Sequence, residues 1–282
     1  MVKLKNGIIE CEISELGAEL QSLKAQGREI IWCGDPAVWS GRAPVMFPIC
    51  GGLKEDRYEL DGESYTLSKH GFAKLMTFEV EKNDGVSALF ALHSNEQTRK
   101  SYPFDFVFRV SFTLVGATLK VTYEAENCGD APMYASFGAH EAYATPEGIE
   151  EYEIVFPEAE TLTAYALNGN LLTDYTKTII TDSKVLPLKD EYFYLDALVF
   201  RGLKSRSAAL VHKNSGKSVN ITFDGHDYFL LWHKYGAKYI CLEPWCGVQD
   251  VAGTSFNIKE KEGIMEIMPG ETLSRTHTIT AG

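Results

Sequence analysis

Apolar and polar residues alternate one by one along most of this chain, and this period of two restricts the fold more than any other feature. The clearest example runs from Asp105 to Glu126, where aromatic and β-branched side chains alternate toward Gly116-Ala117 and back again. Such alternation is typical of strands with one buried face, and a Gly-containing dipeptide between two such segments predicts a turn. We therefore expect an antiparallel hairpin here.

Similar short segments recur from end to end of the sequence. Strands are predicted at Gly7–Ile13, Ala18–Lys24 and Glu29–Trp32, and a second hairpin at Arg57–Leu67, with Asp61-Gly62 in its turn. The segment that follows Phe156, as far as Asp190, is predicted to be rich in loops.

Helical signals are weak in this chain. A single turn is expected at Ser94–Lys100, with Ser94 and Gln97 as its capping box. About twenty short strands in one unbroken β pattern predict an all-β fold, a large antiparallel β-sandwich with few short helices. No repeat or low-complexity linker interrupts it, so one domain is expected over 1–282.

The overall composition excludes several classes of protein. Hydrophobic residues make up 45% of the 282 residues, which is ample for a core, and the net charge is −12. That charge argues against nucleic acid or an anionic membrane as the main partner. Neither an export signal nor an apolar span of about 20 residues is evident, so a soluble cytoplasmic protein is expected, as a monomer or homodimer.

The six cysteines are scattered, without a CxxC pair. Several lie in apolar strand-like segments, where cysteine behaves as a small hydrophobic residue, so reduced thiols are expected. The seven histidines are likewise dispersed and form neither HxH nor HExxH, so no metal site is predicted. Glycine-rich nucleotide loops and the GxSxG nucleophile motif are also missing.

The segment Tyr239–Asp250 contains the strongest candidate for a reactive residue. Glu243 ends the short apolar run Ile240-Cys241-Leu242, and Pro244 is expected to stop the strand there. A carboxylate beside a buried strand and Trp245 is costly to desolvate, so its pKa should rise toward the range of a general base. The alternative is a glutamate that caps a turn and faces water.

Three further segments supply candidate partners for this carboxylate. Trp39–Gly52 is irregular, strongly apolar and contains Arg42, which is typical of a loop that folds over a site. His140 lies among small and apolar residues, so its ring is expected to be enclosed and held by hydrogen bonds. His70 directly precedes a glycine. For either histidine, a structural role in the core is the alternative.

An enclosed histidine and glutamate together with flat aromatic rings favour a sugar site. Trp232 and Trp245 flank the strand of Glu243 and offer apolar faces to the C–H surface of a pyranose. Charged side chains would hold the hydroxyl groups.

Four motifs occur in one order: Arg42-Ala-Pro-Val-Met-Phe-Pro-Ile-Cys-Gly, His70-Gly-Phe-Ala, Phe137-Gly-Ala-His140 and Cys241-Leu-Glu243-Pro-Trp-Cys-Gly. Together they resemble the aldose 1-epimerase (mutarotase) family, and its LacX-type branch in particular. The resemblance extends from about residue 3 to the end, where Phe256-x-x-Lys259-Glu and Pro269-Gly270 fit the same pattern. Glu141-Ala-Tyr departs from the His-Pro-Ala-Phe expected of this branch.

The resemblance implies a galactose-mutarotase-like β-sandwich that interconverts the α and β anomers of an aldose without a cofactor. It implies His140 as the general acid on the ring oxygen and Glu243 as the base on the C1 hydroxyl. The substrate-binding residues that it implies are Arg42, His70 and Asp196, and Trp232 and Trp245 join them because of their aromatic rings.

Three alternatives remain open on the sequence. A hexose-6-phosphate 1-epimerase would need a cluster of Arg or Lys in the pocket. A carbohydrate-binding or sensor protein would keep the aromatic residues without needing His140 and Glu243 together. A glycoside hydrolase would need a second carboxylate across the scissile bond.

Overall fold

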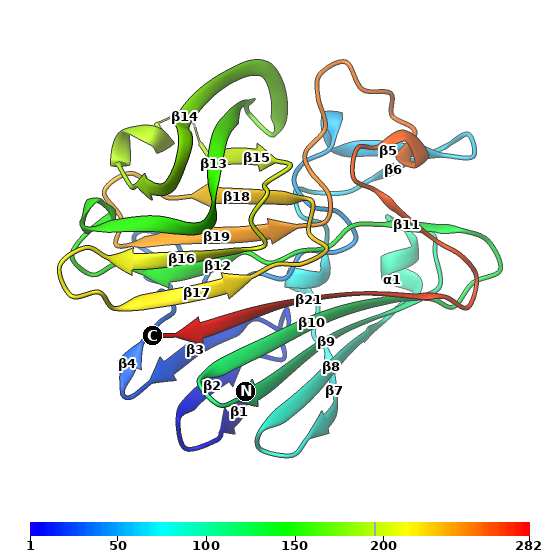
Figure 1. The fold of residues 1–282 in the computed structure, drawn as a ribbon. Helices are drawn as coiled ribbons and strands as arrows, with labels where there is room; N and C mark the ends of the chain where they lie inside the picture. The colour runs from blue at the N-terminus through cyan, green and yellow to red at the C-terminus, as the bar shows by residue number, and fades with distance from the viewer. Residues whose placement is uncertain (195) are drawn as a thin grey trace.

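The computed structural model describes residues 1–194 and 196–282, and antiparallel strands dominate them (Figure 1). Thirteen strands form one long sheet: β7 (Glu79–Asn83), β8 (Ser87–His93), β9 (Phe106–Val115), β10 (Thr118–Asn127), β12 (Glu141–Ala144), β13 (Tyr152–Asn168), β14 (Leu171–Pro187), β15 (Leu198–Arg201), β16 (Ser207–His212), β17 (Ser218–Thr222), β18 (Tyr228–Trp232), β19 (Tyr239–Trp245) and β21 (Thr272–Ala281). Their order is β12-β19-β18-β15-β13-β16-β17-β21-β10-β9-β8-β7, with β14 paired to β13.

Smaller sheets and short helices complete the described structure. The N-terminal sheet contains β1 (Val2–Lys5), β2 (Ile9–Ile13), β3 (Leu20–Ala25) and β4 (Arg28–Glu29), and two pairs are formed by β5 (Arg57–Leu60) with β6 (Glu63–Thr66) and β11 (Met133–Ala135) with β20 (Met265–Ile267). The helices are α1 (Glu96–Arg99) and the 3-10 turns η1 (Lys54–Asp56), η2 (Ala73–Leu75), η3 (Ile149–Glu151), η4 (Asp190–Phe193) and η5 (Ile258–Glu260). None of the helices in the described residues is long and apolar enough to span a membrane.

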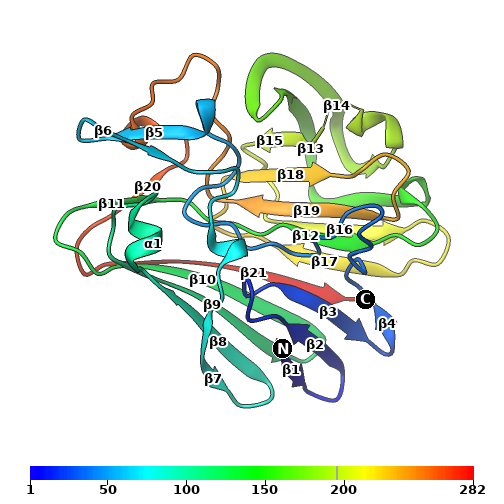
Figure 2. The same cartoon turned by 180° about the vertical axis from the view of Figure 1, so that it is seen from behind.

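The N-terminal sheet lies close to the half of the long sheet that contains β7 to β10, as both views of the fold show (Figures 1 and 2). Buried side chains from both sheets belong to one hydrophobic core, which also takes in Phe47 of the loop after β4. Phe47 of that loop stacks on Phe108 of β9, with ring centroids 4.2 Å apart. The all-β sandwich predicted from the alternation is confirmed.

Both predicted hairpins are confirmed. β9 and β10 pair in register from Val115↔Thr118 to Phe106↔Asn127, around Gly116. β5 and β6 meet at Asp61-Gly62, and both turn residues have positive φ angles of 52° and 91°. This left-handed conformation is the one that an Asp-Gly turn tolerates best.

The prediction of a loop-rich region after Phe156 is wrong. Most of these residues form β13 and β14, which pair with one another despite several register shifts. Most side chains of β14 are exposed or half-buried. Because neither face of this strand is consistently buried, its sequence lacks the alternation of apolar and polar residues that predicts a strand. Cross-strand contacts, such as the hydrogen bond between the side chains of Thr163 and Thr178, stabilise the pairing of β13 with β14 instead.

Hydrogen bonds explain why the boundaries of two short elements differ from the predictions. The N-cap of α1 is Asn95, whose side chain accepts from the N–H groups of Gln97 and Thr98, so the box predicted for Ser94 starts one residue later. The strand predicted at Glu29–Trp32 ends at Glu29, because the chain then leaves β3. Ile31 forms a single bridge with Tyr143, and the N–H of Trp32 donates to the carbonyl of Ala142.

The strand of Glu243 does not stop at Pro244. β19 continues to Trp245, with Pro244 opposite Phe229 of β18. The proline lacks an N–H group but retains its carbonyl, which accepts from the N–H of Ala139. Glu243 is therefore held inside a paired strand, with a fixed direction for its side chain.

Candidate active site

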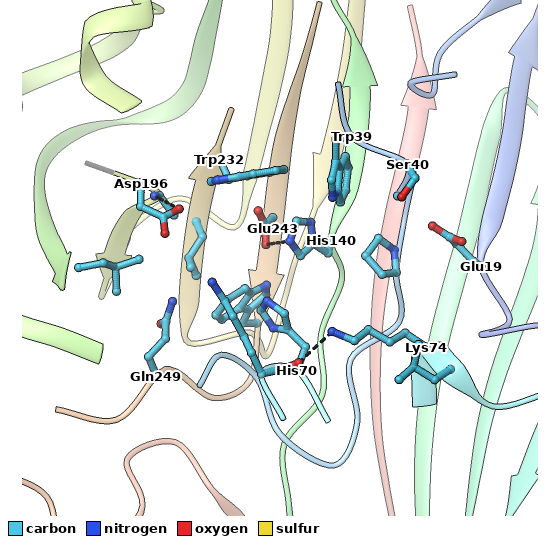
Figure 3. A pocket seen from close by; sticks show the side chains of 18 residues that line it. Glu19, Trp39, Ser40, His70, Lys74, His140, Asp196, Trp232, Glu243 and Gln249 are labelled. Atoms are coloured by element: carbon cyan, nitrogen blue, oxygen red, sulfur yellow. Dashed lines mark hydrogen bonds and ion pairs between the residues drawn. The ribbon is translucent and has the colours of Figure 1, made fainter. Parts of the chain in front are cut away.

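A cavity of about 510 Å³ opens over the face of β18 and β19 (Figure 3). Its lining combines aromatic rings with titratable and amide side chains from both strands and from the loops around them. The lining residues are Glu19, Trp39, Ser40, Gly41, Pro44, Lys69, His70, Lys74, Leu75, His140, Leu167, Asp196, Ala197, Leu230, Trp232, Glu243, Trp245 and Gln249.

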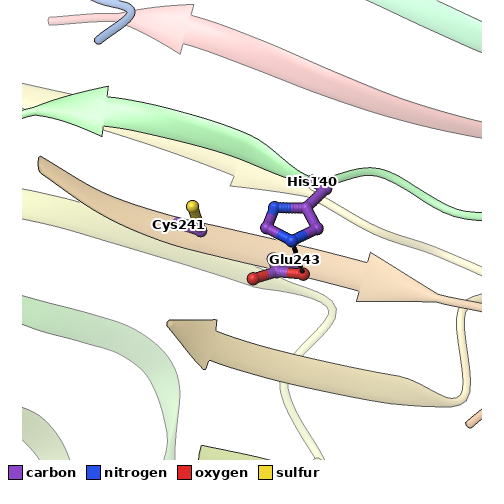
Figure 4. Close-up of side chains that lie close together, drawn as sticks. All are labelled: His140, Cys241 and Glu243. Carbon is purple, nitrogen blue, oxygen red and sulfur yellow. Dashed lines mark ion pairs between the residues drawn. The ribbon is translucent and has the colours of Figure 1, made fainter. Parts of the chain in front are cut away.

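His140 and Glu243 meet in this cavity because of strand register. β12 and β19 are antiparallel with Glu141 opposite Leu242, so the next pair along the ladder brings residue 140 beside residue 243. His140 Nε2 lies 3.4 Å from Glu243 Oε2, and only 9% and 1% of the two residues' surfaces are exposed (Figure 4).

Burial opposes the charged form of both residues. It lowers the pKa of His140 to about 3, and it raises the pKa of Glu243 well above its usual range, although the charge of Lys69 works against that rise. The pair thus favours a neutral imidazole and a protonated carboxyl. His140 Nδ1 and Glu243 Oε2 are buried, and neither has a hydrogen-bond partner among the described residues.

His70 is held in a single tautomer by its backbone surroundings. It adopts a φ of 68° next to Gly71, where a side chain would collide with the Phe47 carbonyl. Its Nδ1 accepts a hydrogen bond from the N–H of Gly51, so the neutral ring carries its proton on Nε2. Burial keeps the ring neutral by moving its pKa well below the usual value. His70 therefore offers an N–H donor.

Three tryptophans surround the His140–Glu243 pair. Trp39 stacks on His140 with ring centroids 5.5 Å apart, and Trp232 meets the same imidazole edge-on at 5.8 Å. Trp245 is buried and donates from Nε1 to the carbonyl of Ala139. Sequence reasoning named Trp232 and Trp245 but missed Trp39, although the irregular apolar loop that starts with it was the available signal.

The structure places Asp196 at the cavity and leaves Arg42 out of its lining. Asp196 has a φ of 120°, a strained conformation of a kind that clusters at functional sites. The guanidinium of Arg42 donates to the carbonyl of Gln21 at 2.6 Å. The prediction that Arg42 binds substrate hydroxyls is thus not supported, because this contact turns its charge toward the N-terminal sheet.

Gln249 is a lining residue that sequence reasoning missed. It is 1% exposed, and its Oε1 has no partner among the described residues. The buried pair Lys261–Asp250, with Nζ and Oδ1 2.7 Å apart, fixes the backbone next to it. No local pattern marks Gln249 in the sequence, because contacts with residues distant in the chain direct its side chain.

The family model described as aldose 1-epimerase matches residues 1–280. The chain belongs to this family. Protein LacX, chromosomal, of Lactococcus lactis subsp. lactis is 29% identical over 99% of this chain and 98% of its own length. A galactose mutarotase related enzyme from Lactobacillus acidophilus has a structure with a TM-score of 0.94 and 31% identity, covering 99% of this chain and 96% of the other.

A more limited match is to a putative glucose-6-phosphate 1-epimerase of Salmonella typhimurium. It is 30% identical over 39% of this chain and 37% of the relative. These similarities confirm the resemblance to the aldose 1-epimerase family and the mutarotase-like fold predicted from the four motifs.

The fold also brings three potential metal ligands together in this member of the aldose 1-epimerase family. Ligand atoms of His140, Cys241 and Glu243 lie within 4.8 Å of one another. Cys241 and Glu243 are two residues apart in β19, so they point to the same face of the sheet. Burial raises the pKa of the Cys241 thiol well above its usual value, and a neutral thiol is a poor metal ligand.

Proposed function

We propose that this protein is an aldose 1-epimerase that interconverts the α and β anomers of a hexose by acid–base opening of the ring. The proposal rests above all on the 3.4 Å contact between His140 and Glu243 at the centre of an aromatic cavity. Both residues are titratable and largely buried, and both line the cavity in which a sugar would lie. Membership of the aldose 1-epimerase family supports the same chemistry.

Ring opening requires one base and one acid. Glu243 as carboxylate takes the proton of the C1 hydroxyl, and His140 as imidazolium gives a proton to the ring oxygen O5. The C1–O5 bond breaks and leaves an aldehyde at C1 and a hydroxyl at C5. Rotation about C1–C2 presents the other face of the aldehyde, and the reverse proton transfers close the ring.

The buried pair can reach the reactive state, with Glu243 as carboxylate and His140 as imidazolium, without gaining or losing a proton. A protonated Glu243 with a neutral His140 contains the same single proton as a carboxylate with an imidazolium, so a transfer across the contact interconverts the two. Each positioned proton transfer accelerates a reaction by about 10²–10⁴-fold, roughly 3–5 kcal/mol, which is sufficient for an intrinsically easy step. The chemistry consists of proton transfers and needs no cofactor.

Several other lining residues supply binding groups for the sugar. His70 donates from Nε2 to a sugar hydroxyl, and Asp196 and Gln249 Oε1 accept from others. Trp232, Trp39 and Trp245 provide flat apolar faces for the C–H surface of the ring.

Two substitutions test the catalytic pair. Glu243→Gln keeps the shape but cannot accept the C1 proton, and His140→Asn cannot deliver a proton to O5. Each should lower kcat by about 10²-fold or more, and the double variant should be little worse than the poorer single one, because the two groups serve one event. Polarimetry on freshly dissolved α-glucose measures the rate.

Matched controls are Glu79→Gln and His93→Asn, both exposed and outside the cavity. They should keep wild-type activity. Near-normal mutarotation by both single variants of the pair, with circular dichroism unchanged, would refute the mechanism. Saturable sugar binding in a wild-type protein without turnover would instead identify a binding or sensor protein.

A further inference from the structure

Two lysines form part of the cavity wall, and the proposed reaction uses neither. Lys69 and Lys74 come from the segment between β6 and the end of η2, the same segment that contains His70. Both are half-buried rather than fully exposed at the surface. Figure 3 shows Lys74 extending toward His70 and His140.

Neither ammonium group has a counter-ion within residues 1–194 and 196–282. Lys74 Nζ donates to the main-chain carbonyl of Lys69 at 2.8 Å, which satisfies one proton but leaves its charge uncompensated. Lys69 Nζ forms neither a hydrogen bond nor an ion pair within the same ranges. Burial, and then the charge of Lys69, lowers the pKa of Lys74, as expected for two cations that lie close together.

Among the described residues, no carboxylate of the cavity forms an ion pair with either lysine, and the charge of Lys69 only moderates the raised pKa of Glu243. Glu19 Oε1 accepts from the N–H groups of Arg42 and Ala43, and Asp196 Oδ1 accepts from the N–H of Ala197. The chain contains 39 acidic against 27 basic residues, so counter-ions are abundant elsewhere on it. Two partly desolvated like charges are costly unless an anion joins them.

The lysines lie near the group assigned to the ring oxygen. Burial is the largest cause of the lowered pKa of His140, and the charges of Lys69 and Lys74 lower this pKa further. In the proposed reaction His140 contacts O5, and O5 is bonded to C5, which carries C6. A substituent on C6 therefore lies close to His140, within range of the same two cations.

We propose that the substrate is an aldose with an anionic group on C6, either a phosphate ester or a carboxylate, which Lys69 and Lys74 bind. This inference rests on the proposed epimerase function and narrows its substrate class. The anion would replace the missing counter-ion, and its charge-assisted hydrogen bonds would hold O5 against His140.

The test compares three sugars with the intact protein. Rates of anomer exchange are measured by NMR saturation transfer for glucose, glucose 6-phosphate and glucuronate. At low ionic strength at least one anionic sugar should have a kcat/KM about 10-fold or more above that of glucose, and added salt should reduce this advantage. A preference for phosphate or for carboxylate identifies which anion the lysines bind.

Substitutions locate the effect. Lys69→Met and Lys74→Met should each lower the ratio of anionic to neutral kcat/KM by about 10-fold, while Lys74→Arg should retain most of it. Lys120→Met, which removes an exposed lysine of β10 outside the cavity, is the control and should leave the ratio unchanged.

Two results would overturn the inference and are distinguishable. If glucose is epimerised as well as the anionic sugars, and the lysine variants do not change the ratio, the epimerase function stands and the anion site does not. If none of the three sugars is epimerised, the proposed function fails and this inference fails with it.

Discussion

The unusual property of the His140–Glu243 pair is the order of its two pKa values. Burial lowers the pKa of His140 to about 3 and raises that of Glu243 well above its usual value. The pair therefore keeps one proton over the range between them, located on the carboxyl in the favoured form. Unperturbed groups would place the proton on the imidazole.

This order predicts the pH profile of kcat/KM. On the acid side, activity falls only near pH 3, when His140 takes up a second proton and the pair has no base left. On the alkaline side, it falls through the raised pKa of Glu243, when the pair loses its only proton. Rates of anomer exchange at a series of pH values measure both limbs. A fall centred near the ordinary glutamate pKa of about 4.3, in protein still folded by circular dichroism, would contradict this assignment.

At the level of elements, β12 has polar contacts on both of its faces. His140 precedes the strand and faces the cavity, whereas Glu141 faces the core and its Oε1 lies 2.9 Å from His277 Nε2 of β21. Only 3% of Glu141 and none of His277 is exposed. This contact joins β12 to the other half of the long sheet, and so fixes the backbone from which His140 projects.

Breaking this contact should destabilise the protein strongly. Glu141→Ala leaves His277 buried without its partner and should lower the free energy of unfolding by about 3 kcal/mol or more. The double variant Glu141→Leu/His277→Leu removes both polar groups and should cost less than the single change. Urea denaturation measures both. A double variant less stable than Glu141→Ala would show that the hydrogen bond is not the source of the loss.

At the level of the whole molecule, buried neutral histidines connect stability to pH. His226 is 1% exposed, lies outside the cavity, and has a pKa lowered to about 3 by burial and by the neighbouring His277. An unfolded histidine titrates near 6.5, so between pH 3 and 6.5 the unfolded chain binds more protons than the folded one. This residue thus favours the folded state above that window, and its contribution is lost as the pH falls.

A variant without this imidazole should show a weaker pH dependence of stability. Within the window, His226 contributes a slope of about 1.4 kcal/mol per pH unit, and His226→Leu should remove that amount. Urea denaturation of wild type and variant at several pH values between 4 and 6.5 gives the difference directly. Equal slopes would mean that His226 takes up protons equally in the folded and unfolded states, which would contradict a lowered pKa.

The sequence by itself determined the class of fold and the family. Period-two alternation with β-branched and aromatic residues has few structural solutions, and turn dipeptides such as Asp61-Gly62 act through local sterics alone. The motifs around His70, His140 and Glu243 also identified the central residues of the cavity, because buried polar side chains stand out against apolar neighbours.

Only the tertiary structure decided how these side chains are directed. The 3.4 Å contact of His140 with Glu243 follows from the pairing of β12 with β19, two strands about a hundred residues apart in the chain. The same kind of distant contact turns Arg42 toward Gln21 and leaves Lys69 and Lys74 in the cavity wall. Local propensity specifies turns and strands, but the direction of a loop side chain depends on which backbone groups the rest of the chain brings to it.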